Sequence, residues 1–128
     1  MLLYIQHLRR DGALEQNFLV AAMDDRAFAF GSVLALGGAQ MLLSKLYVEE
    51  MQRGRGVGRA LFKALCRLAA ELAGGTARLE MRINLHNPSR GFYTRMGMRK
   101  LRDEGMELED FYLSQEVLGM EVSLQDPA

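Results

Sequence analysis

The sequence has little of the chemistry that marks several classes of protein. It holds one cysteine, so no disulfide can form within the chain, which agrees with a reducing cytoplasm. Two histidines and that single thiol make no metal-ligand spacing, so no metal site is predicted. Sixteen basic residues balance sixteen acidic ones, and a zero net charge gives no electrostatic footprint for nucleic acid or an anionic membrane.

Long apolar runs and a targeting segment are missing as well. No apolar stretch approaches the roughly 20 residues that a spanning helix needs, so no membrane insertion is predicted. The opening residues, MLLYIQHLRRDG, lack the basic lead and the small-residue cleavage site of a signal peptide. A chain of 128 residues, 49% hydrophobic and 25% charged, predicts one compact domain over residues 1–128. The single cysteine and the absence of a signal-peptide pattern make the cytoplasm the expected location.

Short apolar runs separated by turn signals make up the first part of the chain. They occupy residues 17–23, 27–36 and 40–48, with Asp24-Asp25 and Gly37-Gly38 at the turns between them. Connections this short leave no room for a crossover helix, so these strands are expected to be antiparallel neighbours. Residues 1–10 fit either a short helix that ends near Gly12 or a first strand.

The clearest helix is predicted over residues 59–73. Its leucines recur at spacings of four, three and four and make one apolar stripe, formed by Leu61, Leu65, Leu68 and Leu72. Cys66 falls on the same side and is predicted to be a core residue.

The remaining elements alternate between strands and one short helix. Strands are predicted at residues 77–84, 98–103 and 118–124, and a helix over 88–96, with Asn87 as its N-cap and Pro88 at its first position. The acidic stretch within residues 102–118 is expected to be an exposed loop, or a surface that attracts a cationic amine. This order of elements predicts an α/β domain, a mixed sheet with helices against it.

Three glycines at alternate positions stand between the third apolar run and the helix, in the stretch RGRGVG at residues 53–58. A helix N-terminus carries unpaired N–H groups and about half a positive charge, and glycines let the preceding backbone approach a ligand. The stretch therefore predicts an anion site suited to a phosphate or pyrophosphate. It is not a P-loop, because Arg59 and Ala60 stand where a lysine and a hydroxyl are needed. The alternative is a strand-to-helix turn with solvated arginines.

Two stretches carry a resemblance to a known family. Arg53-x-x-Gly56-x-Gly58 resembles the Q/R-x-x-G-x-G/A loop of the GNAT superfamily, the acetyl-CoA-dependent N-acetyltransferases. Residues 87–98, NPSRGFYTRMGM, resemble that family's N-P-A-R-x-x-Y-x-x-x-G-F segment, in the family's order. The resemblance implies a GNAT-like mixed, largely antiparallel central sheet with flanking helices. Its N-terminal part is expected to be shortened, because the family starts with a strand and two helices and only sixteen residues precede Asn17.

By this resemblance the chain moves an acetyl group from acetyl-CoA, without a metal, to a primary amine of a small molecule or peptide. The donor's pyrophosphate would bind at the glycine loop, and its pantetheine arm along the preceding strand, which splays from its neighbour. The residues implied in donor binding are Leu46, Tyr47, Val48, Arg53, Gly54, Arg55, Gly56, Val57, Gly58, Arg59 and Asn87. An N–H near Val48 would polarise the thioester carbonyl. For Asn87 the alternative is a simple helix cap.

Two residues are candidates for proton transfer. Tyr93 matches the tyrosine that protonates the departing thiolate in many family members, and a pKa of about 10 suits an acid at neutral pH. The alternative for Tyr93 is a core tyrosine. Residues 40–44 carry no carboxylate, so the candidate base is Glu49 at the end of the same strand, for which the alternative is a solvated surface group.

A competing function is a catalytically inactive GNAT-fold module that binds coenzyme A or regulates another protein. The intact glycine loop and Tyr93 favour the enzyme, and the short N-terminus and the missing carboxylate favour the module. An amine substrate is the expected partner, with no nucleic acid and no membrane. An exposed sheet edge makes a homodimer a reasonable expectation.

Overall fold

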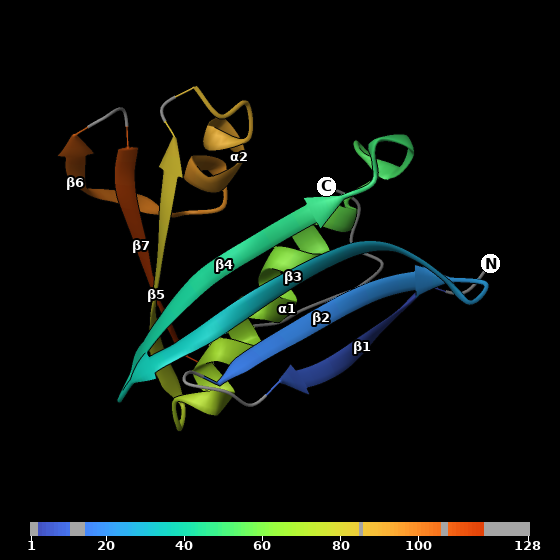
Figure 1. The fold of residues 1–128 in the computed structure, drawn as a ribbon, viewed down its shortest axis with the longest axis horizontal. Coiled ribbons are helices and arrows are strands. Elements are labelled where there is room, and N and C mark those ends of the chain that lie inside the picture. The colour runs from blue at the N-terminus through green and yellow to red at the C-terminus, as the bar shows by residue number, and fades with distance from the viewer. Residues whose placement is uncertain (1–2, 11–14, 85, 106–107, 117–128) are drawn as a thin grey trace.

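The computed structural model describes residues 3–10, 15–84, 86–105 and 108–116. Along the chain the elements are β1 (Leu3–Arg10), β2 (Gln16–Met23), β3 (Arg26–Gly37), β4 (Gln40–Val48), the 3-10 helix η1 (Glu50–Gln52), α1 (Val57–Leu72), β5 (Thr76–Asn84), α2 (Arg90–Arg95), β6 (Arg99–Gly105) and β7 (Leu108–Glu116). The strands form one sheet in the order β1-β2-β3-β4-β5-β7-β6 (Figure 1). Neighbouring strands are antiparallel, except that β4 and β5 are parallel. The predicted mixed, largely antiparallel α/β sheet is confirmed.

The first half of the chain follows its apolar runs closely. Strands β2, β3, β4 and β5 begin and end within one residue of their predicted bounds, and the first three are antiparallel neighbours as expected. Residues 3–10 form a strand, so the strand alternative for this segment is right and the helix is wrong. All eight residues of β1 pair with β2. Five residues separate the two strands, at the place where the family pattern has two helices.

The C-terminal part departs further from prediction. The strand predicted at residues 98–103 is confirmed as β6. The prediction that the acidic stretch forms an exposed loop is wrong, because most of this stretch lies in β6 and β7. Strand β7 pairs with β5 over nine residues, which places it inside the sheet between β5 and β6. The strand predicted at residues 118–124 lies outside the described residues.

Helix α1 begins two residues before its predicted start and packs against one face of the sheet (Figure 1). Leu61 and Leu65 of its stripe are fully buried, whereas Leu68 and Leu72 lie at the margin and are half-buried. The helix approaches β3 closely at Gly31, where a methyl group would overlap the Leu65 Cδ1 atom and lie 3.0 Å from the Lys45 carbonyl oxygen. No helix among the described residues is long and apolar enough to cross a membrane.

Cys66 lies on the buried face of α1, as predicted, and is 1% exposed. Burial raises the pKa of its thiol from 9.0 to about 12, because a thiolate is poorly solvated there. In the unfolded chain the thiol ionises near pH 9, whereas in the folded chain it keeps its proton. This thiol therefore leaves stability unchanged below pH 9. Between pH 9 and 12 it lowers the free energy of unfolding by about 1.4 kcal/mol per pH unit.

The measurement is urea denaturation of wild type and Cys66→Ala at pH 8, 9.5 and 10.5. The variant has a small cavity and should be less stable by ~1 kcal/mol at pH 8. It lacks the thiol, so its stability should fall less steeply above pH 9. The difference between the two proteins should nearly close by pH 9.5, and the variant should be the more stable one by about 1 kcal/mol at pH 10.5. Parallel pH curves for the two proteins would contradict the assignment of the raised pKa to Cys66.

Candidate active site

Strand β4 diverges from its parallel neighbour β5 soon after the N-terminal end of β4, where the two strands pair. The two strands pair only at Gln40, Met41 and Leu42 of β4. Just beyond, Ser44 is an extra residue in the ladder with β3, because Ser32 pairs with Lys45 and Val33 with Leu43. Such a bulge bends its strand and increases the local twist. Figure 1 shows β4 and β5 diverging from this end, as the resemblance implies. The C-terminal half of β4 therefore has no paired strand on its β5 side, and this side is called the gap below.

The backbone of β4 presents polar groups to this gap. The Glu49 N–H donates a 2.8 Å hydrogen bond to the Phe28 carbonyl on the β3 side. A trans peptide directs its C=O opposite to its N–H, so the Val48 carbonyl points away from β3 and toward the gap. Backbone groups alternate in direction along a strand, so Leu46 faces the gap as Val48 does. These are the groups that an extended ligand pairs with when it lies beside a strand.

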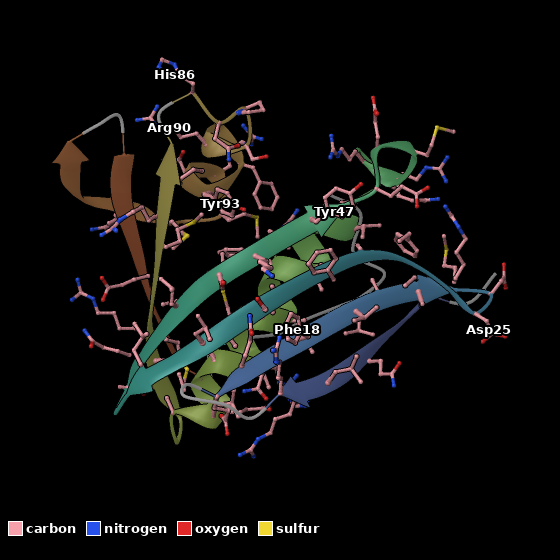
Figure 2. All side chains as sticks on the ribbon, in the orientation of Figure 1. Phe18, Asp25, Tyr47, His86, Arg90 and Tyr93 are labelled. Carbon is pink, nitrogen blue, oxygen red and sulfur yellow. The ribbon has the colours of Figure 1, made fainter. Side chains whose placement is uncertain are left out.

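A pocket of about 420 Å³ lies at the divergence. It is bounded by the end of β4, by the glycine loop with the start of α1, and by α2 with the residues before it. Its lining residues are Leu46, Tyr47, Val48, Arg53, Gly54, Gly56, Gly58, Arg59, Pro88, Ser89, Phe92, Tyr93 and Arg95. Figure 2 shows Tyr47 near the end of β4 and Tyr93 on α2. Thus eight of the residues predicted to bind the donor, from segments 46–48 and 53–59, line one pocket together with Tyr93.

The glycine loop ends in a helix start that favours an anion. Gly56 is the N-cap of α1 and has φ of 79°, a left-handed conformation that side chains other than glycine adopt at a cost. The first hydrogen bond of the helix runs from the Ala60 N–H to the Gly56 carbonyl, at 3.0 Å. The N–H groups of Val57 and Gly58 precede it and have no acceptor within the helix. No acidic residue lies in this first turn, and three arginines line the pocket, so its electrostatic character is cationic.

Tyr93 lines the pocket and is also part of the core cluster. Its role as the acid stays a prediction. Its side chain is 6% exposed. Its ring packs against Phe62 and Phe92, with ring centroids 6.2 Å and 5.3 Å apart. Burial raises the pKa of its phenol above the ordinary 10.0, because the phenolate loses hydration. The hydroxyl therefore keeps its proton at neutral pH and is able to donate it.

Four predicted site residues do not line the pocket. Both carboxylate oxygens of Glu49 accept hydrogen bonds from Arg26 Nη2, at 2.8 and 2.7 Å, so the candidate base is held in an ion pair. Arg55 is exposed, and Val57 is buried in the core cluster. Asn87 is exposed, and its Oδ1 accepts a 2.8 Å bond from the Ser89 N–H.

The prediction of Asn87 as N-cap and Pro88 as first helical residue is wrong. Ser89 is the N-cap, and α2 begins at Arg90. Asn87 closes a turn two residues before the helix instead.

Sequence reasoning missed four residues of the pocket, Pro88, Ser89, Phe92 and Arg95. A signal was present. Ser89, Phe92 and Arg95 recur every third residue, and residues three apart lie along one side of a helix. Because the resemblance already predicts Tyr93 at the site, the residues beside it on the same side of the helix are further candidates for the pocket lining.

The fold and the pocket can be compared with those of known proteins. A model of the acetyltransferase (GNAT) domain matches residues 15–100. The chain belongs to the GNAT acetyltransferase family. The match begins at the start of β2 and includes the glycine loop, α1 and α2. None of the curated proteins compared with this GNAT chain matches it.

Solved structures agree with the GNAT assignment. Nourseothricin acetyltransferase is 26% identical over 80% of this chain and 65% of its own, with a TM-score of 0.63. An acetyltransferase from Thermus thermophilus is 26% identical over 78% of this chain and 64% of its own, with a TM-score of 0.64. The PaiA N-acetyltransferase from Thermoplasma acidophilum, in complex with coenzyme A, is 17% identical over 77% of this chain and 59% of its own, with a TM-score of 0.64. The chain therefore spans less than two thirds of the length of these three proteins.

Proposed function

We propose that this GNAT domain transfers an acetyl group from acetyl-CoA to a primary amine of a small molecule or peptide. One observation carries the proposal: the open edge of β4, the glycine-led start of α1 and Tyr93 all border one pocket. These supply, in that order, a backbone edge for an extended arm, a site for anionic phosphates and a proton donor.

The donor would be held by complementary groups along its length. The pyrophosphate would lie at the helix start, where the N–H groups of Val57 and Gly58 and the helix dipole favour negative charge. Arg59 and Arg95, which line the pocket, add cationic side chains for the phosphates. The pantetheine arm would extend along Leu46 to Val48, where the backbone groups of Leu46 and Val48 face the gap. The donor's anionic head and amide-bearing arm thus fit the two ends of the site.

The chemistry requires the acceptor amine to be neutral. Its nitrogen attacks the thioester carbonyl, an N–C bond forms, and the C–S bond breaks with the electron pair leaving on sulfur. The Val48 N–H would stabilise the oxyanion that forms on the way. The Tyr93 hydroxyl would give its proton to the departing thiolate and regain one from solvent. The amine nitrogen must lose a proton in the same cycle.

Among the described residues that line the pocket there is no carboxylate or imidazole. An amine with an ordinary lysine-like pKa of about 10.4 would therefore have to deprotonate before it binds, or through water. The same observation favours the second candidate function, a GNAT-fold module that binds coenzyme A without transfer. Substrate-dependent turnover separates the two.

The first experiment is calorimetric titration with acetyl-CoA, 3′-dephospho-CoA and ATP, followed by a panel of amines with detection of the released thiol. We expect micromolar binding of acetyl-CoA and much weaker binding of ATP, which shares phosphates and adenine but has no pantetheine arm. Acetyl-CoA binding without thiol release on any amine would select the non-catalytic module. No binding at millimolar acetyl-CoA would contradict both functions.

Two further expectations belong to this proposal. The single cysteine suits the reducing cytoplasm, where we place the enzyme. Strand β1 is an edge of the sheet, and a second copy of the chain pairing there would form the expected homodimer.

A further inference from the structure

Arg53, the first residue of the glycine loop, turns its side chain back onto the end of β4. Its Nε–H donates a 2.9 Å hydrogen bond to the Val48 carbonyl. The guanidinium carbon lies 5.9 Å from the centre of the Tyr47 ring, within the range of a cation–π contact. The Tyr47 ring in turn lies 5.8 Å from that of Phe30 on β3. The side chain is thus tied to the strand beside the pocket as well as lining the pocket.

The acceptor in this bond is a carbonyl that the splay has deprived of a strand partner. The Val48 carbonyl points to the side where β5 would lie, but β5 pairs with β4 no further than Leu42. In a continuous sheet a neighbouring N–H would satisfy that carbonyl. Arg53 supplies the donor from within the same chain. It also fixes the strand end relative to the loop, since only four residues lie between the two bonded positions.

We propose that Arg53 is a positioning residue, whose Nε–H holds the Val48 carbonyl and thereby seats the glycine loop against the open edge of β4. The proposal rests on the proposed function, because its consequence is the affinity for the acetyl donor. The pyrophosphate site is on the loop and the pantetheine edge is on β4, and Arg53 sets their relative position. The hydrogen bond, and not the positive charge, is the part of Arg53 that donor binding needs.

The covalent structures of arginine and glutamine allow the effect of the hydrogen bond to be separated from the effect of the charge. In both residues a nitrogen that carries hydrogen is bonded to Cδ, Nε in arginine and Nε2 in glutamine. Arg53→Gln therefore keeps an N–H donor at the bonding position and removes the charge. Arg53→Met has a methyl carbon at that position, so it removes the donor and the charge together.

The experiment is calorimetric titration of wild type, Arg53→Gln and Arg53→Met with acetyl-CoA, at 50 and 300 mM salt. We expect Arg53→Gln to bind within about threefold of wild type at both salt concentrations. Arg53→Met should bind about tenfold more weakly, the loss expected for one hydrogen bond with a charged donor. Equal losses in both variants, shrinking at 300 mM salt, would mean that Arg53 is a phosphate ligand that acts by charge, and would overturn the positioning role.

A second readout does not depend on the donor. In the ligand-free wild type, the Arg53 Nε–H should give an NMR signal protected from exchange with water, and the amide signals of the glycine loop should move in Arg53→Met but little in Arg53→Gln. If wild type does not bind acetyl-CoA but these shifts appear, the proposed function fails and the positioning contact stands. Loop signals that are the same in all three proteins would overturn the positioning role whether or not acetyl-CoA binds.

Discussion

Gly56→Asp is expected to weaken acetyl-CoA binding by at least about a hundredfold, which corresponds to about 2.7 kcal/mol. Gly56 is the N-cap of α1, lines the pocket and has φ of 79°. An aspartate there would bring a carboxylate to the helix start, where the donor's pyrophosphate is proposed to bind. Two unit charges about 4 Å apart near a protein surface repel by about 4 kcal/mol, so repulsion alone is sufficient for the loss.

The matched control is Gly56→Asn, which has the same shape without the charge. Asparagine and aspartate both tolerate the left-handed conformation better than other residues, so both variants should fold. Calorimetry should give a loss of at most about tenfold for Gly56→Asn, from crowding of the loop. Equal losses would assign the effect to shape, and unchanged affinity in folded Gly56→Asp would remove the glycine loop from the donor site.

Tyr93→Phe is expected to lower kcat by about a hundredfold and to leave the affinity for acetyl-CoA nearly intact. A positioned general acid contributes two to four orders of magnitude, and phenylalanine removes the proton while keeping the ring. The packing of that ring on Phe62 and Phe92 should persist, so the fold should not change. The measurement is steady-state kinetics with a reactive amine, with calorimetry of the donor alongside.

The pH dependence provides a check on this role. Burial raises the pKa of Tyr93, so its hydroxyl should stay protonated through neutral pH and up to pH 10 at least. The amine becomes more nucleophilic over the same range. We therefore expect kcat/KM to rise toward alkaline pH and to fall only above pH 10, and the fall should be missing in Tyr93→Phe. Wild-type turnover in the variant would show that Tyr93 is a core residue and not the acid.

The parts of the fold that sequence predicts well are those in which the local pattern and the final environment agree. Helix α1 carries an uninterrupted apolar stripe, and the face marked by Leu61 and Leu65 is the face that it buries. The turn signals at Asp24-Asp25 and Gly37-Gly38 bound strands β2 to β4, because these residues reach positive φ at low cost.

In residues 3–10 and in β7, strand pairing and not the local sequence pattern determines the secondary structure. The apolar spacing in residues 3–10 fits a helix and a strand equally, and pairing with β2 selects the strand. In β7 the sequence LEDFYLSQE carries charged residues at three of nine positions, two of them adjacent, which weakens the alternation that marks a strand. Nine residue pairs with β5 outweigh that local preference.

The same distinction holds at the candidate site. The glycine loop and the end of β4 are contiguous in sequence, so a short motif is enough to find them. The ion pair that engages Glu49 involves Arg26, 23 residues upstream, and only the pairing of β3 with β4 brings the two together. The lining role of Phe92 and Arg95 likewise depends on where α2 sits relative to β4.

The short contact between β4 and β5 has a consequence for the molecule as a whole. Strands β1–β4 and β5–β7 are joined across the sheet by three residue pairs, and α1 connects them in the chain. The gap divides the sheet into these two parts. A donor that pairs with the edge of β4 would lie in the gap and take the place of a further strand. A ligand that binds only the folded protein stabilises it, so binding of acetyl-CoA would raise the free energy of unfolding. Acetyl-CoA at a hundred times its Kd would raise the free energy of unfolding by about 2.7 kcal/mol. The substrate would in this sense be a structural component of the sheet, and the protein would be most rigid when it is ready to react.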